Sequence, residues 1–193
     1  MRPLWLGFFA LDGRLAGIVA KAREPVLAQL RLAWWRERFA EPATRWPKGE
    51  PLLASLTAWD DERAALVALV DGWEALLAEP PLTAAAAEEF ASGRGRMAAA
   101  IARLAGAQPT AAIAERLGAD WALTDLAEHV RDPEERTTVI GLVTQRPARA
   151  RLPRSLRPLA ILHGLAWRRL RRADLAHRPT DAIAAIRLGL FGR

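Results

Sequence analysis

Apolar residues recur at helical spacing along most of the chain. Between residues 25 and 40, Ala28, Leu32, Trp35 and Phe39 follow one another at steps of three and four, as on one face of an amphipathic helix. Comparable stripes recur in the later segments, and no segment reads convincingly as a strand. The pattern therefore predicts an all-α protein.

Start and stop signals divide this pattern into eight or nine helices. Pro25 and Pro133 suit first helical turns, Asp60 or Asp61 is a candidate cap, Thr83 is another, and Gly106 is a stop signal. The helix after Thr83 is expected to be weakened by two internal glycines at 93 and 95. The predicted helices cover approximately residues 3–23, 25–40, 51–59, 61–78, 83–105, 110–130, 132–144, 153–172 and 180–190. Since no linker or repeat interrupts them, residues 1–193 are predicted to form one helical domain.

The amino-acid composition excludes several classes of structural and catalytic site. About half of the 193 residues are hydrophobic, which is typical of a protein with a real core. The absence of cysteine excludes disulfides, thiolate zinc sites and cysteine nucleophiles. The apolar stretch from Pro3 to Leu11 is too short to span a bilayer, and we interpret it as a buried helix rather than a targeting signal. A cytoplasmic protein is expected.

Charge is distributed unevenly. Residues 146–193 carry 12 of the 28 Lys and Arg but only 2 of the 22 Asp and Glu, a net charge of +10 against −4 for residues 1–145. One interpretation is that arginines cover exposed helix faces; the other is a basic surface for an anionic membrane or a protein partner, which would place the protein at the membrane periphery. A nucleic-acid partner is not expected, because no helix-turn-helix signature is identifiable. The candidate basic surface consists of Arg149, Arg151, Arg168, Arg169, Arg171 and Arg172.

Several enzyme signatures are missing. No phosphate-binding glycine loop follows a strand, and His129, His163 and His177 lack metal-ligand spacing. A cation site has one candidate group: Asp125 and Glu128 are three residues apart on a predicted helix, and Asp132 is four residues further on. The same acids could simply form a solvated edge, and both interpretations stay open.

A tryptophan pair between basic residues is the most distinctive motif. It lies in the segment Leu30-Arg31-Leu32-Ala33-Trp34-Trp35-Arg36-Glu37, downstream of Phe9-Ala10-Leu11 and Arg23-Glu24-Pro25. With Leu123-Thr124-Asp125 and Leu152-Pro153 in the same order, these segments resemble the squalene/phytoene synthase family. They are most similar to the branch that contains a mitochondrial complex I assembly factor and its bacterial relatives. The resemblance spans nearly the whole chain and implies a helical bundle of the isoprenoid synthase type.

Family synthases bind Mg²⁺ and prenyl diphosphates through two aspartate-rich motifs. At the first motif, the resemblance places Ala16, Gly17 and Ala20, none of which can bind a metal. At the second it places His129 and Asp132, so only one carboxylate remains. Because Mg²⁺ ions need several oxygen ligands to neutralise the leaving diphosphate, the resemblance implies a non-catalytic member without a cofactor.

Two functions are therefore expected as alternatives. The first is a non-catalytic protein that binds a lipid or isoprenoid, or acts as an adaptor, with Arg31, Trp34, Trp35 and Arg36 as the candidate binding residues. Those residues could equally be core anchors and ion-pair partners. The second is a Mg²⁺-dependent prenyltransferase whose ligands have moved to Asp120 and the candidate cation group.

Overall fold

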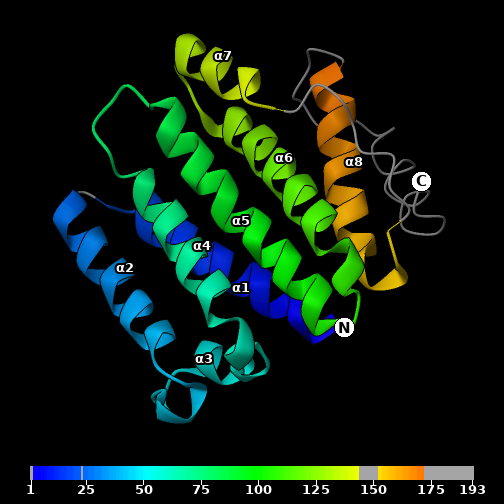
Figure 1. Cartoon of the computed structure of the whole chain (residues 1–193). Helices are drawn as coiled ribbons and strands as arrows, with labels where there is room; N and C mark the ends of the chain where they lie inside the picture. The colour runs from blue at the N-terminus through cyan, green and yellow to red at the C-terminus, as the bar shows by residue number, and fades with distance from the viewer. Residues whose placement is uncertain (1, 23, 144–151, 172–193) are drawn as a thin grey trace.

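The computed structural model describes residues 2–22, 24–143 and 152–171 of the chain. Every regular element in these ranges is helical (Figure 1). The α-helices are α1 (Arg2–Ala20), α2 (Pro25–Ala40), α3 (Pro51–Ser55), α4 (Arg63–Ala75), α5 (Ala84–Leu104), α6 (Ala111–His129), α7 (Pro133–Gly141) and α8 (Arg157–Arg171). Short 3₁₀ turns lie at Ala43–Arg45, Thr57–Glu62, Gln108–Thr110 and Arg154–Leu156. The predicted all-α class is confirmed, whereas the predicted helix over residues 180–190 lies outside the described ranges.

Helix α5 is the centre of the bundle. It packs between α4 on one side and α6 on the other, with α2 outside α4 and α8 outside α6 (Figure 1). Helix α1 crosses behind this layer and contacts α2, α4 and α5. One apolar cluster joins α1 through α6 and reaches Leu159 of α8, and a second fills the space between α5, α6 and α7.

The glycines expected to weaken α5 are required by its packing. A Cβ atom on Gly93 would lie 2.5 Å from the carbonyl oxygen of Ala68 in α4, and one on Gly95 would lie 2.7 Å from that of Glu115 in α6. Any larger side chain would force the helices apart. The low helix propensity of glycine is therefore offset by the close approach of three helix backbones.

Most of the predicted helix signals operate as expected. The Thr83 hydroxyl accepts a hydrogen bond from the Ala86 amide (3.2 Å), and Gly106 ends α5 with a positive φ of 69°. The predicted cap at Asp60 or Asp61 is wrong, because these residues lie in the 3₁₀ turn before α4. Asp60 instead accepts a hydrogen bond from the Ala43 amide (2.8 Å).

Helix α1 is buried on one side only. Phe8, Leu11 and Leu15 are in the core, whereas Leu6 and Phe9 are exposed. Among the described helices, α1 alone is long and apolar enough to cross a membrane by length and composition, and 33% of that stretch is buried in the bundle. This helix is therefore buried along one face, as predicted, and exposed along the other.

Candidate functional site

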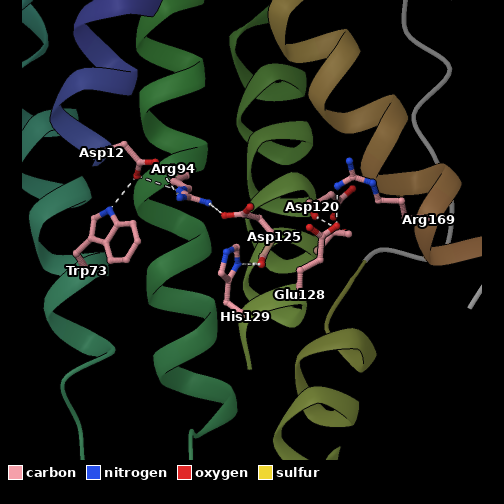
Figure 2. Close-up of polar contacts among 9 residues, drawn as sticks. Asp12, Trp73, Arg94, Asp120, Asp125, Glu128, His129 and Arg169 are labelled. Atoms are coloured by element: carbon pink, nitrogen blue, oxygen red, sulfur yellow. Dashed lines mark hydrogen bonds and ion pairs between the residues drawn. The ribbon is translucent and has the colours of Figure 1, made fainter. Parts of the chain in front are cut away.

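A chain of charges crosses the centre of the bundle from α1 through α5 to α6. Arg94 donates two hydrogen bonds to Asp12, from Nε to Oδ1 (3.0 Å) and from Nη2 to Oδ2 (2.8 Å). Its remaining nitrogen, Nη1, donates to Oδ2 of Asp125 (2.5 Å) (Figure 2). The Arg94 side chain is 5% exposed, so the guanidinium is a buried cation held between two carboxylates.

Aromatic rings enclose this cation. The Arg94 guanidinium carbon lies 4.6 Å from the ring centre of Phe90, 4.7 Å from that of Trp121 and 5.3 Å from that of Trp73. The indole of Trp73 also donates to Asp12 (2.8 Å) (Figure 2). Burial acts to lower the pKa of Arg94, but the two carboxylates outweigh it and the pKa is raised. Arg94 is therefore a permanent positive charge at the centre of the fold.

A second set of polar contacts joins α6 to α8. Arg169 donates to Glu128 (2.7 Å), and the two side chains are 13% and 14% exposed. Six residues earlier on α8, Nε2 of the buried His163 lies 3.6 Å from Oδ2 of Asp120. These contacts hold the two helices together on the side of α6 that faces away from α5 (Figure 2).

The predicted cation group does not converge. Asp125 points toward Arg94 and Glu128 toward Arg169, whereas Asp132 accepts hydrogen bonds from the Glu134 and Glu135 amides at the start of α7. Each acid is thus engaged by a different partner. No group of three or more His, Asp or Glu side chains gathers at metal-binding distance in the part of the chain that the structure describes.

A shallow basic groove separates α1 from α2. Arg14, Lys21 and Arg31 line it, and its apolar walls include Ile18, Trp34 and Trp35. The groove consists of two adjoining hollows of about 340 and 420 Å³, both bordered by Arg14 and Arg31. Glu50 lies at one edge, with its carboxylate 3.7 Å from Arg14.

Three of the four candidate binding residues border the groove, and the fourth points to α4. Arg31 and Trp34 are exposed at the groove, with Trp34 38% exposed. Trp35 also borders the groove but is otherwise buried beside Phe39 in the core. Arg36 points away from it toward α4, where it binds Asp71 (2.7 Å) and Glu74. Burial acts to lower the pKa of Arg36, but hydrogen bonds to these acids outweigh it and the pKa is raised.

The predicted basic surface is only partly visible. Arg149, Arg151 and Arg172 lie outside the described residues, as does the side chain of Arg171. Arg168 is half-buried on α8. Arg169 is turned inward to Glu128 and does not contribute to an exposed surface, which corrects that part of the prediction.

Sequence reasoning missed the central charge chain. Arg94 lies between the two glycines of the helix that follows Thr83, and Asp12 directly follows the apolar stretch that ends at Leu11. The immediate neighbours of both charged residues are glycine or leucine, which is a weak local sign of a buried position. Nothing in the sequence indicates that residues 82 positions apart bind one another.

The chain matches no protein-family model, no curated protein and no solved structure. The resemblance to the squalene/phytoene synthase family and the isoprenoid synthase type of bundle therefore stay predictions.

Proposed function

We propose that the chain is a non-catalytic member of the squalene/phytoene synthase family that binds an isoprenoid or another anionic lipid. The observation that carries this proposal is the position of Arg94 between Asp12 and Asp125. In the family that the sequence resembles, carboxylates from facing helices gather Mg²⁺ around a diphosphate. In this bundle the facing carboxylates of α1 and α6 already bind a cation that is part of the chain.

The energetics oppose replacement of that cation by a metal. Removing the Arg94 guanidinium from its two carboxylates would leave a buried charge without a partner, which costs several kcal/mol in proteins. Two further acids of α6 also have partners, because Glu128 binds Arg169 and Asp120 faces His163. A relocated metal site would require several of these contacts to break at once.

The groove between α1 and α2 provides the ligand site in this proposal. Arg14, Lys21 and Arg31 would bind the phosphate of a head group, since guanidinium groups form paired hydrogen bonds with phosphate oxygens. The exposed indole of Trp34 and the side chain of Ile18 would contact the first part of an apolar tail. The groove is shallow, so the ligand would lie along the surface.

Turnover and binding can be tested on the same purified protein. With farnesyl or geranylgeranyl diphosphate and Mg²⁺, we expect no squalene or phytoene by mass spectrometry. Farnesyl diphosphate should nevertheless quench tryptophan fluorescence without Mg²⁺. Arg31→Ala should weaken this binding by roughly tenfold, as expected for one lost charge-assisted contact.

A matched control is Arg116→Ala, which removes an exposed arginine on α6 far from the groove. It should leave the binding curve unchanged. Mg²⁺-dependent product formation that is lost in Asp125→Ala would establish the alternative, an active prenyltransferase with relocated ligands, and would refute the proposal.

A further inference from the structure

Exposed apolar side chains are concentrated on two helices. In residues 2–22, 24–143 and 152–171 there are six large hydrophobic residues with exposed side chains, and all belong to α1 or α2. They are Leu6, Phe9, Val26, Leu27, Leu30 and Trp34, of which Leu30 is 63% exposed. Isolated exposed leucines need no explanation, but four such residues close together on α2 indicate a surface that binds something apolar.

The apolar residues of α2 form a stripe. Leu27, Leu30 and Trp34 are three and four residues apart, so they share the face opposite to the buried Leu32 and Trp35. Helix α2 is the outermost helix on its side of the bundle, beyond α4 (Figure 1). The stripe therefore faces outward. We call this stripe the outer apolar surface.

Cations lie directly beside this surface. Lys21 and Arg31 are exposed at the groove between α1 and α2, and no acid described in the structure pairs with either of them. Glu50 lies at the edge of the groove but faces Arg14 (3.7 Å), and on α2 the carboxylate of Glu37 lies 3.5 Å from Arg38. The outer apolar surface is thus bordered by unpaired positive charge on its groove side.

We propose that the outer apolar surface docks on an anionic phospholipid bilayer. Leu27, Leu30 and Trp34 enter the boundary between head groups and acyl chains, and Lys21 and Arg31 bind the lipid phosphates. A row of aliphatic side chains with a tryptophan and flanking cations is the composition that favours a membrane interface. In this proposal the membrane contact is made by the outer apolar surface of α2 and the cations beside it.

Docking shares Lys21, Arg31 and Trp34 with the ligand site of the proposed function, but it needs neither a bound isoprenoid nor the absence of turnover. Leu27 and Leu30 belong to the outer apolar surface alone, so they separate the two proposals. Binding is measured by flotation of the full-length protein with vesicles of phosphatidylcholine alone, or with phosphatidylglycerol added. We expect binding to the anionic vesicles only, and weaker binding at higher salt because exposed charges are screened. The double variant L27S/L30S should reduce the partition coefficient roughly tenfold, since it removes two membrane-inserted side chains.

Charge is tested with Arg31→Ala, which should reduce partitioning about fivefold, and with Arg116→Ala as the control, which should not change it. Both leucines are exposed, so circular dichroism should show L27S/L30S to be folded, and it should still bind farnesyl diphosphate.

Vesicle binding that is equal in L27S/L30S and wild type would overturn the inference and leave the basic C-terminal segment as the membrane contact. A wild-type dimer in light scattering that L27S/L30S converts to a monomer, without vesicle binding, would overturn it in favour of an interface between two copies. A monomer that binds no vesicles would also overturn it.

Discussion

Replacement of Arg94 by methionine tests whether the central charge chain holds the bundle together. Methionine keeps an unbranched side chain at this position but removes the guanidinium. Asp12, 11% exposed, would then keep only the Trp73 indole as a donor. Removing one partner of a buried ion pair costs about 3–5 kcal/mol, because the other charge stays buried without compensation. For a chain of this size, that loss should lower Tm by roughly 6–20 °C.

Urea unfolding followed by circular dichroism measures this change, with Arg63→Met as the control. Arg63 pairs with Asp60 at the surface, where both side chains are about one-third exposed, and such pairs contribute about 0–1 kcal/mol. The double variant Asp12→Asn/Arg94→Met should be less destabilised than the sum of the two single variants, since it removes both charges. A free energy of unfolding for Arg94→Met that matches Arg63→Met would refute the argument.

Three further predictions concern the helices. Gly93→Ala should destabilise the protein by about 1–3 kcal/mol in thermal unfolding, because the added Cβ would meet the α4 backbone. Gly13→Ala should stabilise it by about 0.5–1 kcal/mol, because a Cβ there meets nothing within 4 Å and alanine favours the helix. Equal changes in stability for the two variants would contradict this. Thr83→Ala should cost about 1 kcal/mol through the lost cap, and an unchanged urea midpoint would count against that role. The hydrogen bond from the Ala43 amide lowers the pKa of Asp60. The ionised Asp60 carboxylate therefore stabilises the fold above the usual Asp pKa, and this contribution is lost as pH falls through the lowered pKa. Asp60→Asn should flatten the dependence of Tm on pH below about pH 4, and parallel curves for the variant and the wild type would contradict the argument.

The fold class was predictable because helix formation leaves local marks. The stripe that contains Leu32 and Phe39 repeats at the helical period, and both residues are buried. Signals that act within one turn, such as Thr83 before α5 and Gly106 after it, also placed helix ends correctly. The predicted helix cap at Asp60 was wrong because the Asp60 carboxylate accepts a hydrogen bond from the Ala43 amide, which is distant in sequence.

The candidate site was predictable only in part. Arg31 and Trp34 were chosen from a local motif, and both reach the groove between α1 and α2. Arg36, in the same motif, faces α4 instead, because its place on the helix directs it to Asp71. Helical periodicity alone does not say which neighbour each face of α2 will meet.

The sequence by itself determined that this chain would form helices, where most of them begin and end, and which of their faces are apolar. These properties depend on residues three or four positions apart. Only the tertiary structure decided that Asp12, Arg94 and Asp125 form one chain of charges, that Arg169 turns inward, and that Gly93 is a contact point between helices. Those outcomes depend on how whole helices pack, because packing joins residues whose separation along the chain carries no local signal.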